Sequence, residues 1–264
     1  MVCRFIDLLA GTEGIIKRYG GDISRTTLAN YVIALAKLAQ PLINLIREAQ
    51  NSGPLIMADE TRIQVLKEPG YAPTGDKFMW VTLGGPPERQ SVLLDYDPSR
   101  GGHIPMRLLD GFTHDYLQTH GYAGCNEVCR ENMLIQLGCM DHARRKFIEA
   151  QKVQPKGKNV KVTKADMALS FINKLYVIER KIKHLSDDER LAVRQEQSKP
   201  ILKQLKKWLE NNMPRVAKDS LTGKAMKYLH NQWDKLNVYC TDGQLRMTRS
   251  FFQANYSAEY TKPT

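Results

Sequence analysis

Five short apolar segments, rich in β-branched and aromatic residues, are the feature that most constrains how this chain can fold. They predict strands over 55–58, 78–83, 91–96, 116–119 and 134–140. The first three follow one another with turns between them, so we expect an antiparallel meander. Helical patterns then cover 104–109, 126–132 and 141–152. This alternation predicts a mixed α/β sheet with helices on its faces.

The N-terminal fifth of the chain is predicted to be helical. A short helix around 15–19 precedes Gly20-Gly21, and a longer helix begins after Asp22 or Ser24 and runs to Gln50. Its apolar residues recur every three or four positions, and Pro41 is expected to end or kink it. The pair is similar in outline to a helix-turn-helix. A plain helical hairpin packed on a core is the interpretation we favour.

Helical sequence returns after a basic linker over 153–163. One helix starts at Lys164, and a capping box at 186–189 opens the next, which runs past Pro200 with a kink. A further helix covers 221–237. The predicted domains are therefore a helical segment over 1–52, a five-stranded core over 53–152, a basic helical insertion over 153–237 and a divergent tail over 238–264.

Positive charge is concentrated in one third of the chain. The net charge is +11, and the segment from 141 to 235 holds 23 Lys and Arg against 11 Asp and Glu. The rest holds 16 basic and 17 acidic residues. Such a block indicates an anionic partner, most often nucleic acid, and a solvated helical surface is the alternative.

Other counts bear on the compartment. No apolar run reaches the roughly 18 residues of a membrane span, and no signal peptide is recognised, so we expect no membrane partner. Five cysteines, an odd number in a chain of this length, indicate a reducing compartment. The predicted location is the cytoplasm.

Asp59 is the most suggestive acidic residue. It ends the apolar segment of the first predicted strand, where a desolvated carboxylate needs a cation or hydrogen-bond donors. Metal ligation is one interpretation, and a bond to a turn amide is the other. If the fold is that of a two-metal nuclease, a second acidic residue should follow the fourth predicted strand and share the metal ions with Asp59. This chain has His120 at that place. Imidazole suits Mg²⁺ poorly.

Two further sets of residues are candidate sites. Cys125, Cys129, Cys139 and His142 have loosely zinc-like spacing, but we expect no zinc because two would lie on a helix and one at a strand end. Arg144, Arg145 and Lys146 open the helix after the fifth strand. They are predicted to contact DNA phosphates, and a solvated face is equally compatible with them.

Several motifs, in the same order, resemble transposases of the insertion-sequence-66 family over roughly residues 20–247. From the N-terminus they are Ser24-Arg25-x-Thr27-Leu28, Ala58-Asp59-Glu60-Thr61, Met79-Trp80-Val81, Leu94 through Arg100, Tyr116 through Gly124, Gly138 through Phe147, Trp233 through Tyr239, and Asp242-Gly243. The resemblance implies a ribonuclease H-like core, with DNA ends and target DNA as partners. It also implies a bacterial protein that is associated with the nucleoid in the cytoplasm. Arg100 becomes a further candidate for DNA contact.

The resemblance also implies an Asp-Asp-Glu triad that binds Mg²⁺ or Mn²⁺. Such enzymes cut DNA with a metal-activated water and then join the freed 3′-hydroxyl to target DNA. Asp59 matches the first acid. The family has Asp where this chain has His120, and Glu259 is a candidate for the third acid, six residues later than the family pattern places it.

We therefore expect a truncated and degenerate transposase with little or no strand-transfer activity, so whether it is an enzyme stays open. Losing one metal-binding carboxylate typically costs several powers of ten in rate. One alternative is a regulatory DNA-binding fragment that competes with an intact transposase or forms homo-oligomers. Another is an unrelated ribonuclease H-like nuclease, and a third is a chain that folds poorly.

Overall fold

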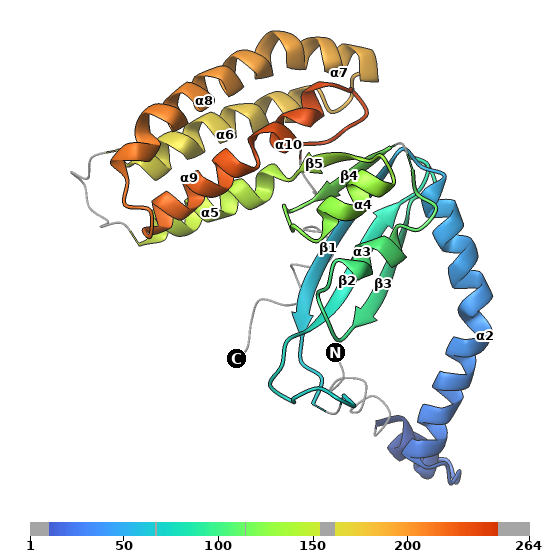
Figure 1. The fold of residues 1–264 in the computed structure, drawn as a ribbon. Coiled ribbons are helices and arrows are strands. Elements are labelled where there is room, and N and C mark those ends of the chain that lie inside the picture. The colour runs from blue at the N-terminus through green and yellow to red at the C-terminus, as the bar shows by residue number, and fades with distance from the viewer. Residues whose placement is uncertain (1–10, 67, 114, 154–161, 248–264) are drawn as a thin grey trace. The chain divides into compact units, whose positions relative to one another are not determined.

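A computed structural model describes residues 11–66, 68–113, 115–153 and 162–247 (Figure 1). The chain divides into two compact units. Unit 1 comprises residues 1–115 and 123–134, and unit 2 comprises residues 116–122 and 135–264. The predicted domain boundaries at 52, 152 and 237 stay a prediction.

Unit 1 contains the predicted meander. Strands β1 (Leu55–Ile63), β2 (Lys77–Gly84) and β3 (Ser91–Asp97) are antiparallel, with Asp59 opposite Val81 and Val81 opposite Leu94. Helices α3 (His103–Leu108) and α4 (Cys125–Glu131) belong to the same unit and pack together. The buried core of the unit includes Ile56, Trp80, Leu83, Leu93, Ile104, Phe112 and Val128.

The first strand is longer than its apolar run predicts. The sequence places Asp59 at the strand's end, but β1 continues to Ile63, and Asp59 lies within it. The reason is the ladder to β2, which extends from Met57 opposite Leu83 to Ile63 opposite Lys77. Backbone hydrogen bonds sustain a strand through polar residues, because the ladder depends on register and not on side-chain polarity.

Helix α2 (Arg25–Asn51) is one continuous helix with Pro41 inside it. Of the two expected N-caps, Asp22 and Ser24, the helix uses Ser24. The Ser24 hydroxyl accepts a hydrogen bond from the Thr27 amide at 3.2 Å. A short helix over 11–18 precedes it. The expectation that α2 packs along a core is wrong, because Gln50 is its one buried residue.

The C-terminal end of α2 is fixed to the sheet by polar contacts. The Gln50 amide donates to the backbone oxygens of Thr82 at 3.3 Å and Ser91 at 2.8 Å, and its own oxygen accepts from the Thr82 hydroxyl. Arg47 forms two hydrogen bonds with the Asp95 carboxylate, at 3.0 and 3.1 Å. The rest of the helix extends away from the sheet (Figure 1).

By length and composition alone, α2 could cross a membrane, and it is the one such helix that the described part of the chain contains. The absence of a membrane partner therefore stays a prediction.

Unit 2 contains a parallel pair of strands, β4 (Tyr116–Thr119) and β5 (Ile135–Gly138). The bounds of β4 are the predicted ones. Helix α5 (Met140–Lys152) follows β5 directly. Together with the antiparallel strands of unit 1, this parallel pair confirms the predicted mixed α/β class.

Two helices of unit 2, α6 (Lys164–Lys181) and α9 (Leu221–Asn231), pack against α5. Helix α8 (Lys199–Asn212) packs against α6, and α10 (Trp233–Asn237) packs against β5. Helix α7 (Asp187–Val193) belongs to the same unit. The capping box at Ser186 and Glu189 is confirmed, and Thr163 forms a second one with Asp166. Short turns η2 (Met213–Arg215) and η3 (Val238–Cys240) complete the described unit.

The helix predicted to run past Pro200 is continuous through α7, a π-helical segment η1 (Arg194–Ser198) and α8, whose second residue is Pro200. The kink expected at Pro200 stays a prediction. One predicted boundary is wrong. The helix predicted over 221–237 is interrupted at Gln232.

Candidate functional site

Asp59 and Glu60 form a pair of adjacent carboxylates on β1. Three buried residues, Ile56 to Ala58, precede them, and Asp59 is half-buried. The Asp59 carboxylate accepts a hydrogen bond from the Glu60 amide at 3.0 Å. A carboxylate oxygen of Asp59 lies within 4.8 Å of one on Glu60. Two such oxygens at one place in a strand are suitable ligands for a divalent cation.

Glu60 is the site residue that the sequence analysis missed. Its side chain is only 5% exposed and is ion-paired with Arg100. The Arg100 guanidinium also lies 5.8 Å from the centre of the Phe78 ring. The available signal was the position of Glu60 directly after Asp59 in the same motif. Because Arg100 is held by a buried acid and an aromatic ring, its first role in unit 1 is to neutralise Glu60.

His120 follows the last residue of β4. Its backbone oxygen accepts a hydrogen bond from the Tyr228 hydroxyl of α9 at 2.7 Å. Its ring lies 5.2 Å from the His142 ring, with 34° between the planes. The next residue, Gly121, has a φ of +93°, and a β-carbon there would approach the Gln232 side chain to 2.7 Å. Glycine is therefore required to hold this turn against α10.

The three predicted phosphate contacts on α5 have different surroundings. Arg144 lies 5.6 Å from the Tyr176 ring centre, and its Nε donates to Asn173 at 3.3 Å. The Lys146 ammonium lies 5.1 Å from the centre of the Tyr228 ring. Arg145 is exposed. Of the three side chains, Arg145 is thus the one most accessible to an external phosphate.

Tyr176 joins α6 to the start of α5. Its hydroxyl donates to the Asp141 carboxylate. Burial, and then the charge of Asp141, raise the pKa of Tyr176 well above its usual value, so the phenol stays protonated as the donor in this bond. The contact holds α6 on the helix that carries Arg144, Arg145 and Lys146.

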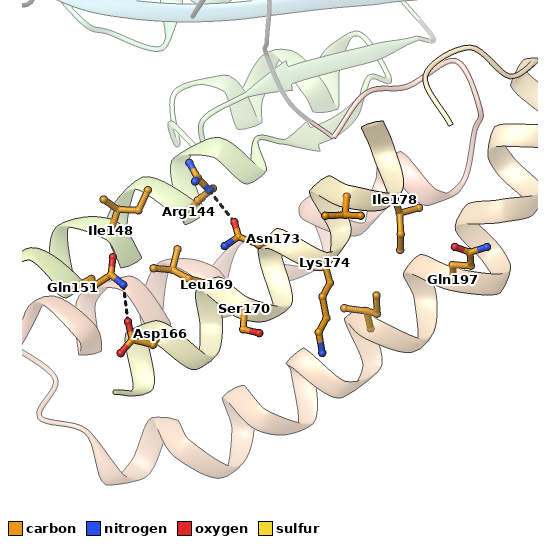
Figure 2. Close-up of a pocket in the computed structure, with 12 residues that line it drawn as sticks. Arg144, Ile148, Gln151, Asp166, Leu169, Ser170, Asn173, Lys174, Ile178 and Gln197 are labelled. Atoms are coloured by element: carbon orange, nitrogen blue, oxygen red, sulfur yellow. Dashed lines mark hydrogen bonds between the residues drawn. The ribbon is translucent and has the colours of Figure 1, made fainter. Parts of the chain in front are cut away.

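A groove of about 910 Å³ lies on the same helices, between α5, α6 and the segment around η1 (Figure 2). Its polar lining includes Arg144, Asn173 and Lys174. At one end, Gln151 donates to Asp166 at 2.6 Å. The backbone amide of Thr163 is the main cause that lowers the pKa of Asp166, so this carboxylate is charged. The groove therefore presents both signs of charge.

The four residues with zinc-like spacing are divided between the two units. Cys125 and Cys129 lie on α4 in unit 1, whereas Cys139 and His142 lie at the start of α5 in unit 2. The four cysteines in the described part of the chain form no disulfide. The expectation of no zinc stays a prediction, and Glu259 lies outside the described residues.

The family model described as "Transposase IS66 family" matches residues 2–249. Two similar proteins from Sinorhizobium fredii carry the names uncharacterized protein y4jD and uncharacterized protein y4hP. The first is 28% identical over 244 residues, 88% of this chain and 46% of the relative. The second is 27% identical over 246 residues, 88% of this chain and 44% of the relative.

This chain therefore spans less than half the length of these relatives. No solved structure matches it.

Proposed function

The chain belongs to the IS66 family of transposases, and from this premise we propose that it binds DNA ends in transposition through a ribonuclease H-like core. The observation that carries the proposal is the family match over 2–249. The placement of the candidate residues supports it, with Asp59 on β1 and His120 directly after β4. A family of this type uses a divalent metal and has DNA as its partner.

The donor chemistry fits that metal only in part. The carboxylates of Asp59 and Glu60 are the hard oxygen ligands that Mg²⁺ prefers. His120, which we assign to the position of the second acid, offers a neutral nitrogen and no negative charge. We therefore propose that Asp59 retains its role as the first acid and that the chain is impaired in strand cleavage and strand transfer. Glu259 is the proposed third acid.

A cleavage assay on the DNA ends of the element tests this function. We expect the chain to bind these ends and to cut them, in Mg²⁺ or Mn²⁺, no faster than its Asp59→Ala variant does. Binding is measured by fluorescence anisotropy and cleavage on denaturing gels. Robust turnover that Asp59→Ala abolishes would contradict the impairment, and cleavage of any DNA without preference for the ends would favour an unrelated nuclease.

DNA binding itself is proposed to depend on the basic surface of unit 2. Replacing the exposed Arg145 with Ala should weaken binding to all DNA sequences alike and should lower the slope of log K against log salt by about 1. The measurement is anisotropy between about 50 and 200 mM salt.

The matched control for that prediction is Arg130→Ala. Arg130 is an exposed arginine of α4 in unit 1, with a side chain 74% exposed and paired to Glu131. The Arg130→Ala substitution removes the same charge outside the basic block, so the slope of log K against log salt should stay that of the unmodified chain. Equal slopes for Arg145→Ala and the unmodified chain would show that Arg145 does not contact the phosphates.

His120 also favours a second function, a regulatory role in which the chain occupies DNA ends without cutting them. Competition distinguishes this role. Adding the chain to an intact family transposase should inhibit excision in proportion to its affinity for the ends.

A further inference from the structure

Helix α2 carries a row of exposed large apolar side chains. Tyr31, Leu35, Leu38, Leu42 and Leu45 are each more than half exposed, and Leu38 reaches 79%. Scattered apolar residues are normal on a surface, but a continuous row of this length marks an interaction site. Helices gain most of their stability from packing, and this one also contains a proline. The row therefore indicates a surface that is covered in solution.

The spacing of the row identifies the kind of contact. Apolar residues follow one another at alternating steps of three and four, at positions 28, 31, 35, 38, 42, 45 and 49. Five of the seven are leucine, and the others are Tyr31 and Ala49. A period of 3.5 residues keeps one seam facing a partner helix, whereas a helix on a globular core has a period of 3.6. We propose that α2 pairs along this seam with α2 of a second copy of the chain.

The seam is separate from the side of α2 that contacts its own sheet. Arg47 and Gln50, which bind Asp95 and the edge of β2 and β3, are the anchors of that side. At 100° per residue they lie about 150° and 90° around the helix from the middle of the seam. The same helix can thus hold its own unit and a second copy at once.

Charge at the flanks of the seam points to a copy rather than to a different helix. Coiled coils select their partners through charged residues beside the apolar positions. Six of the seven flanking positions are uncharged: Thr27, Val32, Ala34, Ala39, Pro41 and Ile46. The seventh is Glu48, at the C-terminal end of the seam. Two copies can therefore approach along α2 with little like-charge repulsion, although each carries a net +11. The seam lacks the series of charges that would select a different partner.

The size of the seam sets the expected strength. A helix of 27 residues is about 40 Å long and about 10 Å wide. Pairing along its whole length would bury roughly 800 Å² over the two copies, less than the roughly 1,200 Å² of a stable interface. We therefore expect a dimer that dissociates at micromolar concentration.

A membrane surface is the competing occupant. Against it, Asn30, Lys37 and Asn44 form a polar stripe along the helix away from the seam. The C-terminal end is also held on the sheet through Gln50. A spanning helix would have to bury this stripe in hydrocarbon, whereas a helix pair leaves it in water.

Sedimentation equilibrium on the full chain, from about 1 to 100 µM, tests the proposal. We expect a monomer–dimer equilibrium, and for Leu35→Glu/Leu38→Glu a dissociation constant at least roughly 30-fold higher, because charges in the seam repel. The control is Asn30→Glu/Asn44→Glu, which adds the same charge on the polar stripe and should leave the dimer intact. Circular dichroism and thermal unfolding confirm that each variant is folded.

Three outcomes would overturn the proposal: a monomer at 100 µM, equal weakening by the seam and control variants, or a folded seam variant that dimerises normally. Binding to neutral phosphatidylcholine vesicles by a chain that stays monomeric would assign the row to a membrane. The proposal does not rest on DNA cleavage, so it can hold or fail independently of the proposed function.

Discussion

Replacing His120 with Asp should raise Mg²⁺-dependent cleavage of the element's DNA ends by roughly 100-fold or more over the unmodified chain. The substitution exchanges a neutral nitrogen for a charged oxygen ligand at the proposed position of the second acid. Each 1.36 kcal/mol of added transition-state stabilisation gives a factor of ten, and a metal-binding carboxylate contributes several kcal/mol. Single-turnover cleavage rates on denaturing gels measure the change.

Metal affinity gives a second, independent measurement of the same prediction. The His120→Asp variant should bind Mn²⁺ at least roughly tenfold more tightly than the unmodified chain, because the added charge and oxygen both favour a hard cation. Electron paramagnetic resonance of free Mn²⁺ measures this without DNA. The effect on cleavage and the effect on metal affinity should both disappear when Asp59→Ala is added.

The chain offers a close control in His142. Its ring lies 5.2 Å from that of His120 in the same unit, so His142→Asp introduces the same charge nearby. His120→Asn changes the same position without adding charge. Neither should raise the rate. If His142→Asp matched His120→Asp, or if His120→Asp gained less than about tenfold, residue 120 would not hold the metal.

The strands show what local sequence can predict. The bounds of β4 were predicted correctly, because turn residues bound its four residues on both sides and all four pair with β5. The end of β1 was not, because Thr61 and Arg62 are polar and exposed, yet their backbones pair with Met79 and Phe78. Register with another strand decides such a boundary, and register is not visible in the strand's own sequence.

Helix α2 shows a different limit. Its apolar periodicity predicted a helix, and the helix runs from Arg25 to Asn51. The same periodicity was interpreted as a face on the chain's own core, whereas the row from Tyr31 to Leu45 is exposed. A period reveals that a face needs cover but not which molecule supplies it.

Site residues could be predicted where the local sequence around one residue points to it. They could not be predicted where the feature is a contact between two residues far apart in the chain. Asp59 and His120 were found because each follows an apolar strand segment. The pairing of Glu60 with Arg100 joins residues 40 positions apart and left no local pattern. Arg194 was counted with the basic block, although its partners in the tail lie 45 to 51 residues away.

Replacing that buried Arg194 with Met should destabilise unit 2 by about 3–5 kcal/mol, the cost of breaking a buried ion pair by removing one partner. The Arg194 side chain is 2% exposed. It forms two hydrogen bonds with Glu179, at 2.9 and 2.8 Å. It also donates to the backbone oxygens of Tyr239 and Asp242 at 2.9 Å and of Leu245 at 2.8 Å.

Methionine keeps the apolar stem but leaves the Glu179 carboxylate without its cation and four carbonyl groups, including that of Gly243, without this donor. Urea unfolding followed by circular dichroism measures the loss, which is a large share of the roughly 5–15 kcal/mol of a typical domain. Hydrogen exchange should rise most over residues 239–245, the segment that contains the Asp242-Gly243 motif.

Two further variants isolate the contribution of the buried Arg194–Glu179 pair. Arg190→Met removes an arginine that is 20% exposed and is paired with an Asp187 side chain that is 59% exposed, so it should cost less than Arg194→Met. Arg194→Met/Glu179→Met removes both charges and should recover part of the loss, since no buried charge then lacks a partner. A double variant as unstable as Arg194→Met would show that the backbone bonds to 239–245, and not the pairing with Glu179, hold this segment.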